Sequence, residues 1–270
     1  MTTGRTIAAF IVICTALVAG IAAPAQAENT WAPEAEATVH PGVTTYTDGA
    51  QCTANFVFTQ GTSVYLGQAA HCSGTGAATD TDGCTSASLP LGTPVTVTGA
   101  TKPGVMVYNS WIAMQKAGER DPETCAYNDF ALIRLDPADA ARTNPTVPKW
   151  GGPTAVGGAA VGESVYSYGN SSLRFGVAVL SPKQGTVVEA SPGGWSHTVY
   201  TVTPGIPGDS GSAFLNAKGE ALGILSTLAF APLPGSNGVG TLRPELAYAR
   251  GHGFPDLALA AGTRPFSAGL

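Results

Sequence analysis

The sequence has few charged residues and no basic cluster. Asp, Glu, Lys and Arg make up 11% of its 270 residues, the formal net charge is −5, and only four histidines are present. A nucleic-acid-binding surface needs clustered Lys and Arg side chains to neutralise phosphates. The composition therefore argues against a nucleic-acid partner. The sequence also carries no nucleotide-binding fingerprint, so we expect no cofactor.

Long apolar runs are missing after the first 27 residues. Before that point Arg5 is followed by an apolar run over residues 7–23 and by Ala25-Gln26-Ala27, which predicts a secretory signal peptide over residues 1–27. The alternative is an uncleaved membrane anchor, but a span takes about 20 apolar residues and this run is shorter. We therefore expect an extracellular chain that starts at Glu28 and has no membrane contact. Because Arg5 is the only charged residue removed, its formal charge falls from −5 to −6.

Cysteine is scarce, and its spacing is unlike that of a metal site. One of the five cysteines, Cys14, lies in the predicted signal peptide. The four that remain are Cys52, Cys72, Cys84 and Cys125. They form no Cys-x-x-Cys pair and no paired His motif accompanies them, which argues against zinc, so no metal is expected. In an exported protein four cysteines predict two disulfides, with three possible pairings.

The rest of the chain consists of short β-branched and aromatic runs between turn residues. Many short strands at this spacing predict an all-β sandwich or barrel, and no long amphipathic helix is evident. A helical turn or two is expected around residues 245–250. The predicted strands include residues 56–58, 64–66, 95–97, 105–107, 130–135, 165–168, 198–202 and 221–225.

A loop-like stretch over residues 137–153, rich in Pro and Gly, divides these strands into two sets. The division favours two packed β-barrels, one over residues 43–148 and one over residues 149–270, the second including a C-terminal tail. Residues 28–42 show no clear periodicity and are expected to form an N-terminal arm or a short propeptide.

Three short strings carry the chemistry of this chain. They are Ala69-Ala70-His71-Cys72, Asn128-Asp129-Phe130-Ala131-Leu132 and Pro207-Gly208-Asp209-Ser210-Gly211-Ser212. A serine hydroxyl needs a base to take its proton as it attacks a carbonyl, and a carboxylate behind the imidazole fixes the tautomer. His71, Asp129 and Ser210 supply these three groups. The backbone amides of Gly208 and Ser210 can stabilise the oxyanion, because glycine lets the chain approach the substrate closely.

Each string also has an ordinary structural interpretation. Gly, Asp and Ser favour turns, a lone histidine is commonly a packing or surface residue, and Asp129 could simply begin a strand. His197 and His252 are interpreted in this way. For the three strings, order, apolar context and the predicted signal peptide all agree, and we therefore interpret them together as a catalytic site.

The three strings, followed by Gly223-Ile224-Leu225-Ser226, resemble secreted bacterial members of the chymotrypsin- and trypsin-like serine peptidases over roughly residues 43–250. The resemblance implies an all-β fold of two packed antiparallel β-barrels with the active site in the crevice between them. It implies a His71, Asp129 and Ser210 triad, an oxyanion hole at Gly208 and Ser210, and Ser226 beside Asp129. It also favours a disulfide between Cys52 and Cys72.

The sequence departs from the family pattern in three respects, one of which is that the stretch between the predicted signal peptide and the first barrel is too short for a large folding prodomain. Ser212 replaces the glycine that usually ends the serine motif, which is a small change. No apolar-apolar-Gly-Gly start precedes residue 50, so activation by a new terminus that pairs with Asp209 is not expected. An internal cation could replace that terminus, and Arg174 or Lys183 is the candidate.

Substrate preference is inferred from the same resemblance. Pro204 stands six residues before Ser210, where trypsin-like pockets place an acid, which argues against a preference for Arg or Lys. Ser226, Thr227 and Leu228 would form one wall of the pocket. We expect an apolar or small side chain before the scissile bond.

These observations predict a secreted, monomeric serine endopeptidase that acts on polypeptides through an acyl-enzyme at Ser210. An esterase of the α/β-hydrolase class would need Gly-x-Ser-x-Gly with Asp and His after the serine, and this chain has Ser212 at the last position and the opposite order. The remaining alternative is an inactive, peptidase-like secreted binding protein.

Overall fold

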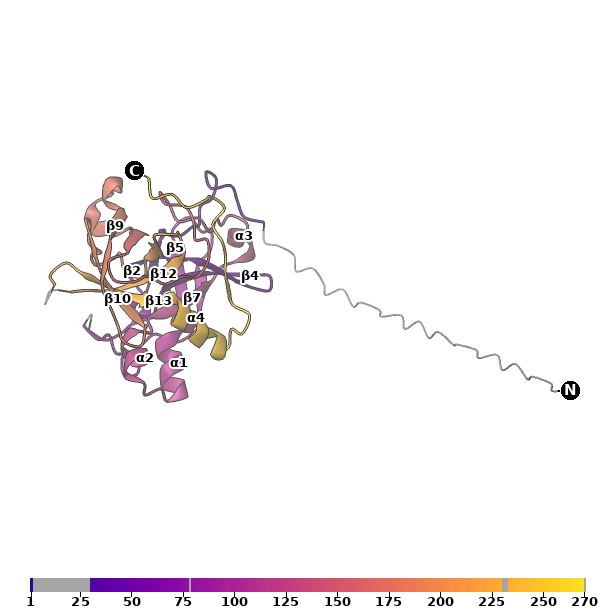
Figure 1. Ribbon diagram of the computed structural model, residues 1–270, viewed down its shortest axis with the longest axis horizontal. Coiled ribbons are helices and arrows are strands. Elements are labelled where there is room, and N and C mark those ends of the chain that lie inside the picture. The colour runs from indigo at the N-terminus through magenta and orange to yellow at the C-terminus, as the bar shows by residue number, and fades with distance from the viewer. Residues whose placement is uncertain (2–29, 78, 230–232, 270) are drawn as a thin grey trace.

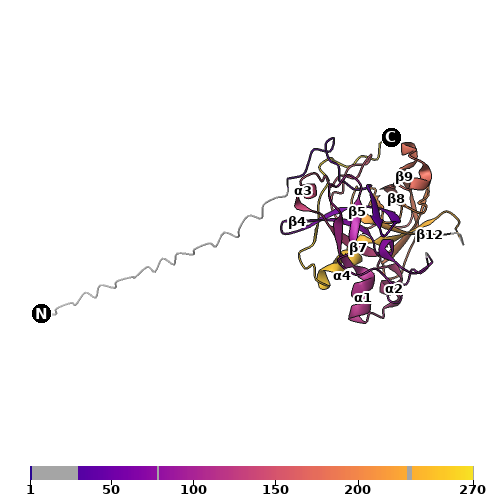
Figure 2. The ribbon, with the colours of Figure 1, turned by 180° about the vertical axis from the view of Figure 1, so that it is seen from behind.

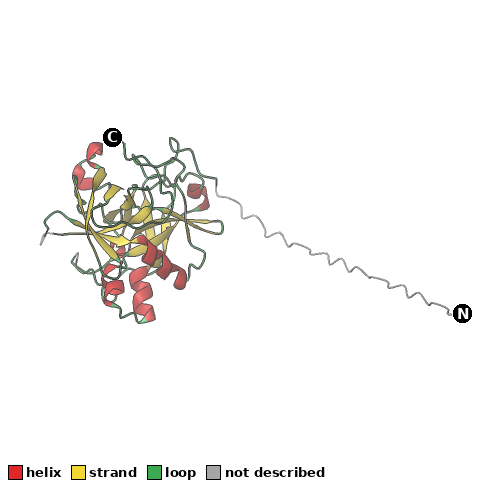
Figure 3. Ribbon diagram, viewed as in Figure 1, coloured by secondary structure: helices red, strands yellow, loops and turns green. Residues whose placement is uncertain are grey.

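The computed structural model describes Met1 and residues 30–77, 79–229 and 233–269, so the predicted signal peptide lies outside the described residues. The chain builds two antiparallel β units, with the helices at their periphery (Figure 1, Figure 3). Among the described residues, no helix is both long and apolar enough to cross a bilayer.

The first unit is an eight-stranded antiparallel sheet. In spatial order its strands are β14 (Ala258–Leu259), β3 (Val57–Gln60), β4 (Ser63–Ala69), β7 (Phe130–Arg134), β6 (Gly104–Asn109), β5 (Pro94–Val97), β1 (Thr44–Thr47) and β2 (Ala50–Thr53). Burial alternates along β5, where Val95 and Val97 are buried and their neighbours are exposed, as expected of a strand with one face on the core.

The second unit is a closed six-stranded barrel. In order around the barrel its strands are β10 (Ser196–Thr201), β13 (Asn237–Thr241), β12 (Ala221–Leu228), β11 (Ala213–Asn216), β8 (Ser164–Tyr168) and β9 (Pro182–Ala190). This unit confirms the expected all-β class and one of the two expected barrels. The first unit is not the closed barrel that was expected, because its sheet is open, with β2 and β14 as its two edge strands. At the end of β2, the backbone amide of Thr53 donates a hydrogen bond of 2.8 Å to Ser210 O in the second unit.

Three hydrophobic clusters form the cores of the two units and of the contact between them. One lies inside the first sheet and includes Leu66 and Ile133, and one lies inside the barrel and includes Phe214 and Leu222. The third joins the two units. Its members are Phe56, Phe58, Tyr65, Tyr108, Phe130, Leu132, Val147, Trp150, Tyr166, Ala213, Leu215, Ala221, Ile224, Leu242, Leu246, Ala249 and Leu257. The core between the units therefore fixes how the loops of one face the loops of the other.

Seven short helices complete the described fold. They are η1 (Ala70–Ser73), α1 (Ser110–Ala117), α2 (Pro122–Tyr127), α3 (Pro137–Ala140), η2 (Ser172–Arg174), η3 (Ala178–Leu180) and α4 (Leu242–Gly251). Helices α1, α2 and α4 gather at one end of the molecule in both opposite views (Figure 1, Figure 2). Helix α4 confirms the helical turns expected around residues 245–250.

Both ends of the described chain pack on the linker between the two units. In the N-terminal arm, Val39 is fully buried and forms a parallel bridge with Thr143. The C-terminal tail returns to the first sheet, where β14 pairs with β3. An ion pair of 2.9 Å between Arg264 and Glu34 connects the tail to the arm.

Candidate functional site

His71 lies in η1, directly after β4. Its backbone amide donates to Asp129 Oδ1 at 2.8 Å, and the amide of Ala70 donates to the Asp129 carbonyl at 3.1 Å. Asn109, at the end of β6, donates from Nδ2 to the Ala70 carbonyl at 3.1 Å, while its Oδ1 caps α1. These bonds fix the turn that presents the imidazole, whose side chain is 26% exposed.

The imidazole of His71 is paired with the carboxylate of Asp129. His71 Nδ1 lies 2.6 Å from Asp129 Oδ2, and Ser226 Oγ donates to the same oxygen at 2.5 Å. An ionised carboxylate only accepts hydrogen bonds, so Nδ1 carries the proton and Nε2 of the neutral ring is left as an acceptor. Burial lowers the pKa of His71, but the charge of Asp129 and its hydrogen bond raise it more, so the pKa lies above its usual value.

Ser210 lies in the loop between β10 and β11. The backbone of this loop passes close to the ends of β2 and β4, and β4 leads directly into His71. A Cβ on the neighbouring Gly211 would lie 2.6 Å from Thr53 O and 3.0 Å from Ala69 N, so only glycine allows this approach. The hydroxyl of Ser210 makes no hydrogen bond to His71 in the described part of the chain.

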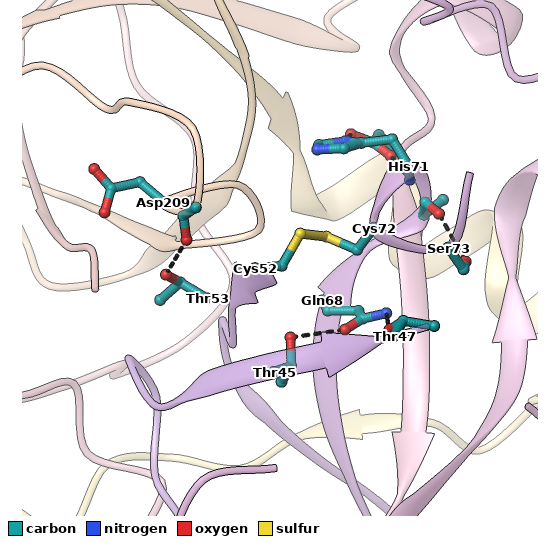
Figure 4. Close-up of a disulfide and its surroundings, with 12 residues drawn as sticks. Thr45, Thr47, Cys52, Thr53, Gln68, His71, Cys72, Ser73 and Asp209 are labelled. Atoms are coloured by element: carbon teal, nitrogen blue, oxygen red, sulfur yellow. Dashed lines mark hydrogen bonds and ion pairs between the residues drawn. A yellow bond between two sulfur atoms is a disulfide. The ribbon is translucent and has the colours of Figure 1, made fainter. Parts of the chain in front are cut away.

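The disulfide between Cys52 and Cys72 connects the segment that carries His71 to the strand that contacts the Ser210 loop. Cys72 follows His71, and Cys52 precedes Thr53, whose side chain donates to the Gly208 carbonyl at 2.7 Å. Figure 4 shows His71 beside Cys72, and Thr53 and Asp209 beyond Cys52. The second disulfide joins Cys84 to Cys125, so two disulfides are present and the first has the pairing that the resemblance implied.

The turn before Ser210 leaves two backbone amides free. The amide of Asp209 donates to the Ile206 carbonyl at 2.8 Å, and Gly208 at the third position has a φ of 95°, which favours glycine. Among the described residues, neither Gly208 N nor Ser210 N donates a hydrogen bond. Two unpaired backbone amides beside a serine hydroxyl are the kind of hydrogen-bond donors that an oxyanion hole requires.

The side chain of Asp209 stabilises this turn, because its carboxylate is fully buried and paired with two cations. Arg174 lies 2.8 Å from Oδ2 and Lys183 lies 3.1 Å from the same oxygen. The amide of Ser171 donates to Oδ1 at 2.9 Å, and that of Ile206 donates to Oδ2 at 3.1 Å. The sequence predicted Arg174 or Lys183 as the cation, and the structure places both at the carboxylate.

The structure places the predicted specificity residues on two segments that one side chain connects. Ser226, Thr227 and Leu228 end β12, and all three are half-buried, as is Pro204. The buried Asn237 donates to Thr227 O at 3.1 Å and accepts from the amide of Gly205, next to Pro204, at 2.7 Å. Asn237 therefore connects the segment of Pro204 to the predicted wall from Ser226 to Leu228, and it is a supporting residue that the sequence did not reveal.

Metal ligands group at two places among the described residues, and neither suits an ion. One group contains Cys52, His71 and Cys72, and the other contains Asp82, Cys84 and Cys125. Every cysteine in them belongs to a disulfide, so no thiolate is available as a ligand.

Comparison with known proteins relates this architecture to solved structures. No family profile and no curated protein matches the sequence. Thermobifida fusca protease A is 19% identical with a TM-score of 0.54, over 83% of this chain and 99% of that one. Cellulomonas bogoriensis chymotrypsin is 18% identical with a TM-score of 0.51, over 82% and 98%. A glutamic acid specific serine protease is 20% identical with a TM-score of 0.53, over 82% and 100%. At these identities the likeness concerns the fold, and the chain has the fold of bacterial chymotrypsin-like serine proteases.

Proposed function

We propose that this chain is a secreted serine endopeptidase that hydrolyses polypeptides through an acyl-enzyme at Ser210. The observation that carries the proposal is the hydrogen-bonded pair of His71 and Asp129, which faces a serine loop with two unpaired amides across a disulfide. The two disulfides support export, because such bonds persist in oxidising compartments.

In the proposed reaction, Ser210 Oγ attacks the carbonyl carbon of the scissile peptide while His71 Nε2 takes the hydroxyl proton. The carbonyl oxygen becomes an oxyanion, which the amides of Gly208 and Ser210 stabilise. Collapse of the intermediate breaks the C–N bond, and the imidazolium gives its proton to the leaving amine. Water, activated by the same imidazole, then attacks the ester and restores Ser210. Asp129 keeps Nδ1 protonated and stabilises the imidazolium.

The substrate side chain before the scissile bond would lie between Pro204 and the segment from Ser226 to Leu228. No acidic residue occupies these positions, so a cationic side chain would find no partner there. This composition supports a preference for apolar or small side chains.

Covalent labelling tests the nucleophile directly. We expect a fluorophosphonate to modify the folded protein at Ser210, because only an activated hydroxyl attacks phosphorus rapidly. Peptide mapping by mass spectrometry identifies the site, and heat-denatured protein is the control that should take no label. Label on another serine, or none, would contradict the proposal and favour the binding-protein alternative.

The pH profile tests the base. Activity requires neutral His71, so kcat/KM should rise with pH through the pKa of His71, above its ordinary value of about 6.5. In Asp129→Asn the attraction of the carboxylate is lost and burial still disfavours the charged ring, so the pKa should fall. An NMR titration of the His71 ring in both proteins checks the direction. An unchanged or raised pKa in the variant would contradict the assignment.

A further inference from the structure

Glu245 is a buried carboxyl group behind the proposed triad. It lies in α4 and is fully buried. Its Oε1 accepts the backbone amide of Asp129 at 3.1 Å, while its Oε2 has no hydrogen-bond partner among the described residues. Within the same residues no ion pair involves Glu245. Glu245 therefore accepts a hydrogen bond but has no counterion among the described residues.

Among the described residues, no positively charged group shifts the pKa of Glu245. The titratable side chains around it are Asp129 at the start of β7, Tyr108 on β6 and Tyr248 on α4, with Glu119 beyond Tyr248. The hydroxyls of Tyr108 and Tyr248 are also buried without hydrogen-bond partners among the described residues. Burial raises the pKa of Glu245 well above its usual range. The hydrogen bond from the Asp129 amide lowers this pKa, whereas the negative charge of Asp129 raises it, and the effect of burial prevails.

The two carboxyl groups differ in the number of hydrogen bonds that they accept. Asp129 accepts three hydrogen bonds, from the backbone and ring of His71 and from Ser226, whereas Glu245 accepts one. Two neighbouring buried carboxylates without a cation cannot both ionise at low cost. Glu245, with one hydrogen bond and no counterion among the described residues, is therefore the carboxyl group that favours the protonated form.

We propose that Glu245 is a positioning residue for Asp129 and acts as a neutral carboxylic acid. Its carbonyl oxygen holds the Asp129 amide, and its lack of charge leaves Asp129 as the single negative group behind His71. Ser110 braces the residues on either side, since its hydroxyl donates to the Asn128 carbonyl at 2.7 Å and accepts from Phe130 N at 3.0 Å. This inference rests on the proposed peptidase function.

Glu245→Gln and Glu245→Ala test the role in the full-length chain. Glutamine is neutral and keeps an oxygen for the Asp129 amide, so kcat should stay within about threefold of the unaltered protein. Alanine leaves that buried amide without a partner, so kcat should fall about tenfold at unchanged KM. Full kcat in Glu245→Ala would overturn the positioning role.

The acid limb of the pH profile separates a neutral Glu245 from an ionised one. If Glu245 is already neutral, Glu245→Gln removes no charge and the pKa of His71 stays where it was. If Glu245 is ionised, the same substitution removes a negative charge and moves the limb to lower pH. A shift to lower pH would overturn the proposal, and the comparison does not depend on whether Glu245→Ala folds.

Infrared spectroscopy reads the proton without any enzymatic assay. A difference spectrum between the unaltered protein and Glu245→Gln at neutral pH should contain the carbonyl stretch of a protonated carboxylic acid. Its absence would contradict the neutral Glu245 even in an inactive protein. By contrast, a protein that shows this band but takes no label at Ser210 would contradict the peptidase function and not the protonation of Glu245.

Discussion

Ser210→Ala is expected to lower kcat by about 10⁶-fold, the scale on which serine proteases lose activity when the nucleophile is removed. Stability should change by less than about 0.5 kcal/mol, the usual range for a side chain without special contacts. The structure gives a reason for this separation. Ser210 is tied to its surroundings by its carbonyl, which accepts the Thr53 amide, and its hydroxyl bonds to none of the described residues. Peptidase activity and urea unfolding of the purified variant check both parts.

Ser212→Ala is the matched control for this experiment. Ser212 is fully buried, and its hydroxyl donates to the Asp209 carbonyl. Losing that bond should cost about 1 kcal/mol of stability and leave the nucleophile in place. We therefore expect opposite patterns in two serines only two positions apart. Retained activity in Ser210→Ala would show that another group performs the attack.

Asp209→Ala is expected to lower the free energy of unfolding by about 3–5 kcal/mol, because removing one partner of a buried ion pair leaves uncompensated charge. In this variant Arg174 and Lys183 would remain buried with no anion beside them. The turn before Ser210 would also lose its bonds from the Ser171 and Ile206 amides. Urea unfolding monitored by tryptophan fluorescence measures the loss, and a change below about 1 kcal/mol would contradict this account.

Lys183→Met provides the contrast within the same cluster. Burial lowers the pKa of Lys183 and the neighbouring Arg174 lowers it further, although Asp209 raises it. Its Nζ makes no hydrogen bond of good geometry among the described residues. Methionine is a similarly long apolar side chain, and Arg174 would still neutralise Asp209. We expect a cost below about 1.5 kcal/mol.

Some of the strands that the sequence predicted alternate in burial, and others are buried along most of their length. The expected strand over residues 95–97 lies within β5, and the one over residues 198–202 overlaps β10, which ends at Thr201. Strand β9 was not anticipated, because it begins with Pro182 and buries Lys183 where polarity indicates an exposed side. That lysine is buried to reach Asp209, a partner in a distant loop, and no local pattern reveals such a contact.

The proposed catalytic residues could be predicted because each lies in a short, recognisable string of the sequence. The residues that position them lie in no such string. Helix α1 could have been found from Asn109 and Gly118, which cap its two ends. Ser110 and Glu245 act on Asp129 from residues 19 positions before it and 116 after it. Only the packing of α1 against β7, and of α4 against α1, β12 and β13, brings them together, so one sequence without its fold could not single them out.

The pairing of β14 with β3 has a consequence for how the molecule is made. Ribosomes release a polypeptide from its amino end, so the barrel strands are all synthesised before Ala258 and Leu259 emerge. The β3 edge of the earlier sheet therefore stays uncovered until Ala258 and Leu259 have been synthesised. A product truncated after α4 would therefore leave that edge open to unwanted association.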